Sequence, residues 1–449
     1  MLEIALPQGA HEIISALRSG GCEAYLVGVC VRDILLGTVP KDWDICTNAA
    51  PDKVKSCLSR YKIIETGIKH GTVTAIVDSV PYEITTYRGE GGEYSANLYE
   101  DLSRRDFTIN SIAYSESYGP IDPFDGAGDL ERGVIRCAGD PSTRFKEDPL
   151  RILRALRFSS VYGFGFDAPT LDAALHCAGL LGNVAPERIR TELCKMLAGK
   201  DVLRILLDGQ KIITQVIPEL SPCVGFEQNN HYHCYTVYGH IAHSVASYNG
   251  DDISVKVALL LHDIGKPECY TEDENGGHFK GHAAISHRIA EGVLNRLRFD
   301  NKTKHDILEL IMYHDAEIPN TQKTVKRWLN RLGGAQFRRG EEQFRRLLEV
   351  KLADIKAHSQ KNREQRIAAI AGVFPTLEQV LKDEQCFSLK NMNISGADLI
   401  RLGVPEGKEI GAILRELLEE VMAGNLANTP EALTEAAKRR IGLLGSSQE

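Results

Sequence analysis

The stretch GVCVRDILLGTVPKDWDICT, Gly28 to Thr47, decides the fold that we expect for the first part of the chain. The apolar residues YLVGV that lead into it predict a buried strand, and Gly28 allows a tight exit because glycine adopts a positive φ easily. VRDILL then predicts a short helix, and Gly37 suits its carboxyl end. A strand, a turn and a helix in this order point backbone N–H groups at an anion.

The segment DWDICT predicts a second strand, on which Asp42 and Asp44 project to one face and Trp43 to the other. Two parallel carboxylates at a strand end fit Mg²⁺, which prefers carboxylate, phosphate and water oxygens. Such ions can activate an attacking hydroxyl and neutralise a leaving pyrophosphate. A DxD pair alone is usually an ordinary polar strand end, but the preceding glycine turn and Arg32 favour a catalytic site.

Composition limits the class of protein. The chain has 449 residues, 43% of them hydrophobic, which is typical of a folded protein of several domains. The net charge of -8 argues against a nucleic-acid coat, although a local basic surface is compatible with it. Eleven cysteines without a CxxC pair, no signal-like start and no apolar run of about 18 residues lead us to expect a cytoplasmic protein without a membrane segment.

The organisation changes along the chain. Residues 24–88 alternate short β-rich runs with helical pieces, whereas apolar positions after about residue 145 follow helical spacing almost throughout. We therefore expect a head that contains a sheet, followed by a long helical body.

The run LVGVCVRDILLGTVPKDWDICTNAAP, Leu26 to Pro51, resembles the catalytic signature of the class II tRNA nucleotidyltransferase and bacterial poly(A) polymerase family. The usual form is LVGGxVRDxLLG followed by DxDxxT. This sequence departs from it at Val29, where a second glycine is expected. A β-branched residue there disfavours a positive φ and takes up space near a triphosphate.

Four further segments resemble motifs of this family in the family's order. They are the ribose and phosphate motif DLSRRDFTIN from Asp101, the flexing connector DPFDGAGDLERGVIRC from Asp122, the nucleobase-reading helix EDPLRILRALRF from Glu147, and the closing motif ERIRTEL from Glu187. The resemblance implies an α+β fold, with a polymerase-β-like head built on a small mixed sheet and an all-α body that includes an HD domain. The implied domains are the nucleotidyltransferase head 1–145, a nucleobase-reading neck with RNA-binding helices 146–229, an HD domain 230–360 and a helical, tRNA-binding tail 361–449.

The nucleobase-reading segment can also be argued from chemistry. Asp148 and Arg151 lie three residues apart, which would place them on one face of a helix. A carboxylate accepts from the amino group of C or A, and a guanidinium donates to the adjacent ring nitrogen, whereas U and G present the opposite pattern. This pair would select CTP and ATP without a template. Arg154 and Arg157 continue the face and could hold base or phosphate, or form only a salt-bridge network.

The candidate residues of the head follow from these motifs. Asp42 and Asp44 are the expected catalytic and Mg²⁺-binding residues, with Glu83 of YEITTYR as a third carboxylate. The expected nucleotide-binding residues are Gly28, Arg32, Arg105, Asp148, Arg151, Arg154 and Arg157, with Asn110 as a further candidate.

A second constellation lies in the body, where ten of the fourteen histidines fall between His231 and His314. The order H…HD…H…HD resembles the HD superfamily of metal-dependent phosphohydrolases. Imidazole and carboxylate suit Mn²⁺, Ni²⁺ or Co²⁺, which could activate water against a phosphate ester. The alternative is a degenerate helical domain retained for RNA binding. The expected ligands are His240, His262, Asp263, His282, His314 and Asp315.

The resemblance implies a tRNA 3′-terminal nucleotidyltransferase that uses CTP and ATP with Mg²⁺. Its oligomeric state stays open. One alternative is CC addition only, because only GEGGEYSANLYE, residues 89–100, stands where CCA-adding relatives carry a longer loop. Others are a poly(A) polymerase, and an HD phosphohydrolase or RNA-binding protein with a decayed head.

Overall fold

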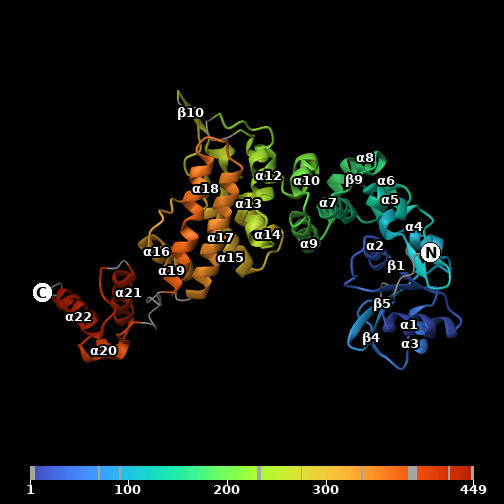
Figure 1. Ribbon diagram of the computed structural model, residues 1–449, viewed down its shortest axis with the longest axis horizontal. Helices are drawn as coiled ribbons and strands as arrows, with labels where there is room; N and C mark the ends of the chain where they lie inside the picture. Colours follow the sequence, from blue (N-terminus) through green and yellow to red (C-terminus); the bar gives the residue numbers. More distant parts are fainter. Residues whose placement is uncertain are drawn as a thin grey trace. The chain divides into compact units, whose positions relative to one another are not determined.

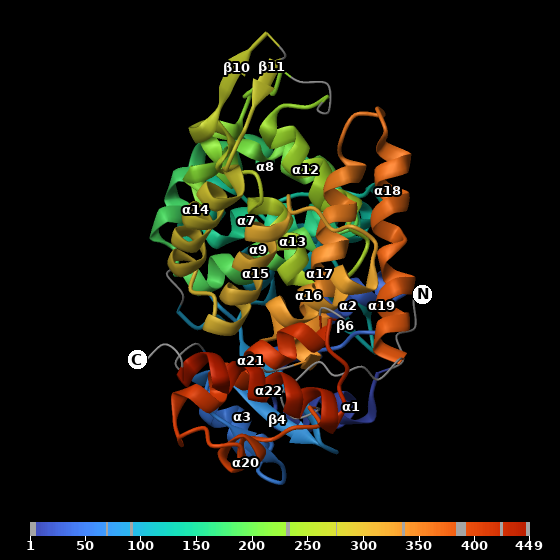
Figure 2. The ribbon, with the colours of Figure 1, turned by 90° about the vertical axis from the view of Figure 1, so that its left-hand side faces the viewer.

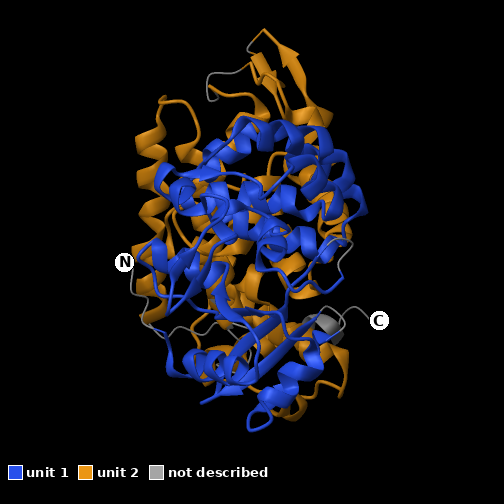
Figure 3. Cartoon of the chain, turned by 90° about the vertical axis from the view of Figure 1, so that its right-hand side faces the viewer, with its two compact units in different colours: residues 1–216 blue, residues 217–449 orange. Residues whose placement is uncertain are grey.

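A computed structural model provides the structure of the chain. The chain divides into two compact units, Met1–Val216 and Ile217–Glu449 (Figure 3). The finer domain boundaries expected at residues 145, 229 and 360 stay predictions. The structure describes residues 6–68, 71–89, 93–229, 234–274, 276–334, 337–382, 392–422 and 425–445.

A seven-stranded mixed sheet forms the centre of the first unit, in the order β3-β4-β5-β2-β1-β6-β7. β2 and β5 are parallel, and the other neighbouring strands are antiparallel. This sheet confirms the expected α+β head. Its strands are β1 (Ala24–Val27), β2 (Asp44–Thr47), β3 (Lys62–Ile64), β4 (Thr72–Val77), β5 (Val80–Thr86), β6 (Ala113–Ser115) and β7 (Gly119–Ile121).

The turn after β1 forms as the sequence predicts, with Gly28 at a φ of 78° and helix α2 (Val29–Leu35) directly behind it. Val29 is the first residue of this helix and is not among the described residues with positive φ. The expectation that its β-branched side chain would oppose a positive φ is therefore wrong, because the backbone at this position is helical.

The expectation that Asp42 and Asp44 share a strand is also wrong. β2 begins at Asp44, which pairs with Glu83, and Asp42 lies in the bend before it. The ladder with β5 begins at the pair Asp44 and Glu83, and a further backbone hydrogen bond before it runs from Glu83 N–H to Trp43 O at 3.3 Å.

The helices of the head surround the sheet. α1 (Gln8–Ser19) and α3 (Pro51–Cys57) contact each other and pack on strands of the sheet (Figure 1). Val27, Cys46 and Tyr87 contribute to a fully buried core beside the carboxyl end of β1. α4 (Leu98–Ser103) and α5 (Gly126–Arg132) complete the head.

The segment that follows the head is mainly helical. The short strand β8 (Val134–Ile135), near the end of the head, pairs in parallel with β9 (Gly165–Phe166) of the neck. The nucleobase-reading segment is not one helix from residue 147, as the sequence suggested. Pro149 restricts Asp148 to an extended conformation, so one helix ends at Glu147 and the next begins at Leu150. The helices are α6 (Pro141–Glu147), α7 (Leu150–Tyr162), α8 (Ala168–Cys177), α9 (Pro186–Leu197), α10 (Val202–Asp208) and α11 (Gln210–Val216).

The second unit is a helical assembly. α17 packs on α12, α13, α15 and α18, and α14 packs on α15; α20, α21 and α22 form a smaller group at the end of the chain (Figure 2). No helix among the described residues is long and apolar enough to cross a membrane. The bounds are α12 (Val237–Ser247), α13 (Ile253–Leu261), β10 (Thr271–Asp273), β11 (Gly276–His278), α14 (His282–Arg296), α15 (Asn301–Tyr313), α16 (Gln322–Gly333), α17 (Phe337–Lys356), α18 (Arg363–Ala371), α19 (Val373–Lys382), α20 (Gly396–Arg401), α21 (Lys408–Met422) and α22 (Pro430–Gly445).

Candidate active sites in the head and in the helical unit

Two carboxylates stand side by side in the head sheet. Asp44 and Glu83 are direct partners in the parallel pair of β2 and β5. Burial, and then the charge of Glu83, raise the pKa of the Asp44 carboxyl to about 6, and the charge of Asp42 acts in the same direction. Oxygen donors that repel one another in this way fit a hard divalent cation such as Mg²⁺.

A cavity of about 310 Å³ opens beside these carboxylates. Its lining combines these two carboxylates and that of Asp101 with four arginines, so it suits an anion that is bound together with a cation. Asp42 is not part of this lining, although its charge reaches Asp44. The lining residues are Val27, Asp44, Ile45, Thr72, Glu83, Thr85, Arg88, Asp101, Arg104, Arg105 and Arg151.

Arg105 is held in place at the edge of this cavity. Its Nη2 donates to Asp101 Oδ2 at 3.0 Å, and the other oxygen of Asp101 accepts from the backbone N–H of Arg88 at 3.1 Å. A side chain at Gly28 would place its Cβ 3.0 Å from Arg105 Nη1. The glycine turn therefore leaves room for the arginine that faces the cavity.

Asp148 and Arg151 do not act as a pair in this structure. Asp148 lies outside α7, and its Oδ2 accepts from Arg188 Nη2 of α9 at 2.8 Å. Arg151 lines the cavity, and its guanidinium donates to Glu147 and to the carbonyl oxygen of Arg104. Of the expected base-reading pair, Arg151 thus lies at the cavity, whereas Asp148 forms an ion pair with Arg188 of α9.

Arg154 and Arg157, which the sequence placed on the same face, form salt bridges. Arg154 donates to Asp106 Oδ2 at 2.6 Å, and Arg157 lies 3.0 Å from Glu192 Oε2. Of the two roles expected for Arg154 and Arg157, nucleotide binding or a salt-bridge network, these contacts correspond to the salt-bridge network. Asn110 donates to Asp106 and accepts from Arg32.

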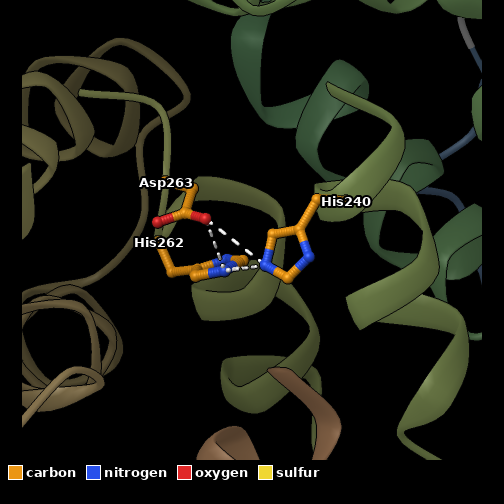
Figure 4. Close-up of side chains that lie close together, drawn as sticks. All are labelled: His240, His262 and Asp263. Atoms are coloured by element: carbon orange, nitrogen blue, oxygen red, sulfur yellow. Dashed lines mark hydrogen bonds and ion pairs between the residues drawn. The ribbon is translucent and has the colours of Figure 1, made fainter. Parts of the chain in front are cut away.

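The second unit gathers the expected histidines into a buried cluster. His240 comes from α12, and the His262–Asp263 doublet follows α13 (Figure 4). His240 Nε2 and His262 Nε2 lie 3.4 and 3.3 Å from Asp263 Oδ2. Asp354 of α17 completes this first ligand set, with its Oδ1 at 2.8 Å from His240 Nε2 and 3.6 Å from His262 Nε2.

A second ligand set uses the other oxygen of Asp263. His282 Nε2 and His314 Nε2 lie 3.4 and 3.6 Å from Asp263 Oδ1 and 3.0 Å from each other. This Oδ1 is buried and accepts no well-formed hydrogen bond within the described parts of the chain. A buried carboxylate oxygen between two imidazoles fits a divalent transition ion, and the whole donor set fits two such ions that share Asp263.

The charges of the cluster support this interpretation. Burial lowers the pKa of His240, which leaves a neutral imidazole, the form that binds metals. Burial also opposes the charged form of His262, but Asp263 and Asp354 outweigh it and raise the pKa of His262 to about 10. The carboxylates that hold this proton are the ones that would hold a divalent cation.

Sequence reasoning missed Asp354 and His358. His358 Nε2 lies 3.4 Å from Asp354 Oδ1, and these two residues with His240 could hold a metal ion. Their only local signal is a spacing of four residues at the end of α17, without an HD doublet. Asp315, an expected ligand, lines the adjacent cavity but belongs to none of the metal-ligand groups found among the described residues.

A cavity of about 800 Å³ opens onto this cluster. It is large enough for a nucleotide. Both ligand sets reach its wall through Asp263, His282, His314 and Asp354, and its cationic lining residues are Lys266, Lys280, Lys351 and Arg366.

Three family models match the chain. The poly(A) polymerase head domain matches residues 24–136, the RNA and SrmB-binding site of polymerase A matches residues 163–223, and tRNA nucleotidyltransferase domain 2 matches residues 279–437. The first match contains the carboxylates of the head cavity.

Relatives match over nearly the whole chain. A CCA-adding enzyme of Leuconostoc mesenteroides is 30% identical in an alignment 453 residues long, and the alignment covers 97% of this chain and 98% of the relative. A CCA-adding enzyme of Ligilactobacillus salivarius is 31% identical over 456 residues, with 96% of each chain covered. The crystal structure of the Bacillus stearothermophilus CCA-adding enzyme in complex with CTP is similar with a TM-score of 0.71 at 26% identity, and the alignment covers 98% of this chain and 100% of that one.

Proposed function

The chain belongs to the family of CCA-adding enzymes, and we infer that it adds nucleotides to the 3′ end of tRNA without a nucleic-acid template. CTP and ATP are its nucleotide substrates in this proposal. The observation that carries it is the head cavity, where Asp44 and Glu83 face four arginines.

The roles within the cavity follow from charge. We assign Asp42 and Asp44 to Mg²⁺, with Glu83 as a third carboxylate beside Asp44. When bound, the metal supplies activation of the tRNA 3′ hydroxyl and neutralisation of the pyrophosphate. Arg105, fixed by Asp101, faces the triphosphate and contributes equally for every nucleotide, because phosphate contacts carry no base information.

Base choice is assigned to Arg151 and Asp148. Arg151 already lines the cavity, and the Asp148 carboxylate would have to leave Arg188 to reach a base beside it. Together they would accept and donate in the pattern that C and A require and that U and G oppose.

The test is CMP incorporation into tRNA that lacks CCA. Replacing both Asp42 and Asp44 by alanine should lower the rate by about a hundredfold or more, because the metal loses its ligands. His262→Ala, in the other unit, serves as the matched control and should retain the rate. Incorporation that survives the double replacement would refute the assignment.

Within this activity, we propose that AMP addition is the weak step. The connection between β5 and α4 is short, and it is closed by a bridge between Arg88 and Tyr94 and by the hydrogen bond from Gly89 N–H to Glu93 O at 2.7 Å. A segment anchored at Arg88 and Asp101 has little length with which to reshape the cavity for a second base. AMP addition should therefore be slow relative to CMP addition, and CC-only addition is the extreme case of this proposal.

The histidine cluster supports a second activity, hydrolysis of a phosphate ester. The two ligand sets around Asp263 suit Mn²⁺, Ni²⁺ or Co²⁺, and the metal, when bound, supplies an activated water. The cationic wall of the cavity suits a phosphate, for example a terminal or 2′,3′-cyclic phosphate on tRNA. Phosphate release with added Mn²⁺ should disappear in His262→Ala and persist in the double aspartate variant. Release that His262→Ala leaves unchanged would show that another site or a contaminant is responsible.

A further inference from the structure

Arg32 follows the glycine turn, but its guanidinium is occupied within the protein. The residue is 3% exposed. Its Nε and Nη2 donate to Asp33 Oδ1 at 3.0 and 2.7 Å, and its Nη1 donates to Asn110 Oδ1 at 2.8 Å. It is not part of the cavity lining described for the head. Every nitrogen of this side chain thus has a protein partner, and the side chain is buried away from the cavity in which the triphosphate is proposed to bind.

The same guanidinium lies against two aromatic rings of α7. Its central carbon is 5.1 Å from the centre of the Phe158 ring and 5.0 Å from that of Tyr162. The two rings stack on each other at 6.1 Å with an interplanar angle of 17°. Cation–π contacts gain strength when they are removed from water, as this one is.

A second route joins the same elements. Asn110, which accepts from Arg32, donates through Nδ2 to Asp106 Oδ1 at 2.9 Å. Asp106 Oδ2 in turn accepts from Arg154 of α7 at 2.6 Å. Arg154, Phe158 and Tyr162 are spaced four residues apart, so one face of α7 makes all these contacts with the head.

We propose that Arg32 is a positioning residue for base selection and not a ligand of the triphosphate. Its contacts with Phe158 and Tyr162 fix the position and orientation of α7 against the head, and α7 carries Arg151 at the wall of the cavity. This inference rests on the proposed nucleotidyl transfer and names the residue that sets its base preference. Lysine cannot replace Arg32, because it lacks the planar group that stacks and donates in several directions at once.

The test uses the full chain with Arg32→Lys and Arg32→Gln. kcat and KM are measured for CTP and UTP on tRNA that lacks CCA, together with inhibition by inorganic pyrophosphate. We expect the CTP:UTP ratio of kcat/KM to fall by about tenfold in both variants while pyrophosphate inhibition stays within about twofold. A uniform loss for both nucleotides, with weaker pyrophosphate inhibition, would make Arg32 a phosphate ligand and overturn the proposal.

Tyr162→Leu tests the contact from the α7 side and does not depend on folding of the Arg32 variants. This substitution should also lower the CTP:UTP ratio of kcat/KM. Arg18→Lys is the control, because Arg18 also lies over an aromatic ring of the head, Tyr25, away from α7; it should leave the ratio unchanged. A wild-type chain that incorporates no CMP would refute the proposed function, whereas active variants with the wild-type ratio would refute the role of Arg32 alone.

Discussion

Gly28 shows how one residue opens the head cavity. Its φ of 78° is disfavoured for any residue with a Cβ, and that Cβ would stand 3.0 Å from Arg105 Nη1. The positive φ favours glycine here, and a Cβ would in addition crowd the Arg105 guanidinium. Val29, by contrast, needs no special backbone, because α2 starts there.

We predict opposite outcomes for two substitutions at this turn. Gly28→Ala should lower kcat/KM for CTP by about tenfold or more, because it strains the turn by about 1 to 2 kcal/mol and displaces Arg105. Val29→Gly, which restores the residue usual in the family, should leave CMP transfer within about twofold and cost up to about 1 kcal/mol of stability. Steady-state kinetics and thermal melting distinguish the two. A large gain of activity in Val29→Gly would mean that Val29 obstructs the triphosphate.

The ion pair between Asp148 and Arg188 leads to a second prediction. Asp148→Ala should relax discrimination against UTP by about 1 to 3 kcal/mol, the value of one good bidentate base contact. Arg188→Ala should keep or sharpen the preference for CTP, because it frees Asp148 without removing it. The pair is partly exposed, so neither change should greatly lower the melting temperature. An unchanged CTP:UTP ratio in Asp148→Ala would contradict the base-reading assignment.

Sequence reasoning found site residues that lie in local motifs and missed those that only packing brings together. Asp42, Asp44 and the His262–Asp263 doublet are visible in short patterns. Asp354 enters the histidine cluster only because α17 packs on α12 and α13; its partner His240 lies 114 residues earlier in the chain. The contact between Arg32 and α7 could not be predicted for the same reason. The family motif suggests that Arg32 binds phosphate, but in the folded chain its guanidinium packs on Phe158 of α7.

At the scale of elements, the strand–turn–helix at the head was predictable, and the start of β2 was not. β2 starts at Asp44 because its register is set by β5, a partner that the local pattern does not reveal. The break before α7 was predictable, because a proline restricts the residue that precedes it. Asp148 therefore lies outside α7, and the expectation that Asp148 and Arg151 share one helical face is wrong.

The short connection between β5 and α4 gives a third prediction, which separates CC from CCA addition. Three tRNA ends, lacking CCA, ending in C and ending in CC, are supplied with CTP and ATP separately and together. We expect CMP addition to the first two and weak or missing AMP addition to the third, because the bridge at Arg88 and Tyr94 leaves little chain to adapt the cavity. Efficient AMP addition to the CC-ended tRNA would establish full CCA addition with a shortened loop.

At the scale of the whole molecule, each of the two compact units has its own buried core and its own candidate site. The carboxylates and arginines of the head lie in the first unit, and both ligand sets of the histidine cluster lie in the second. No ligand of either site comes from the other unit among the described residues. The chemistry also differs, because oxygen donors suit Mg²⁺ and imidazoles suit transition ions.

This separation predicts that Asp354→Asn will affect one activity alone. The substitution is nearly isosteric and removes a charged ligand from the first ligand set, so bound Mn²⁺ should fall from about two ions per chain to about one or fewer. Phosphate release should fall with it, whereas CMP transfer with Mg²⁺ should stay within about twofold. Asp315→Asn is the matched control, because Asp315 lines the same cavity outside the ligand groups and should keep the metal content. Metal content, phosphate release and CMP transfer are measured on one preparation of each variant. Loss of both activities in Asp354→Asn would show that the two units depend on each other. Unchanged metal content in Asp354→Asn would show that Asp354 is not a metal ligand.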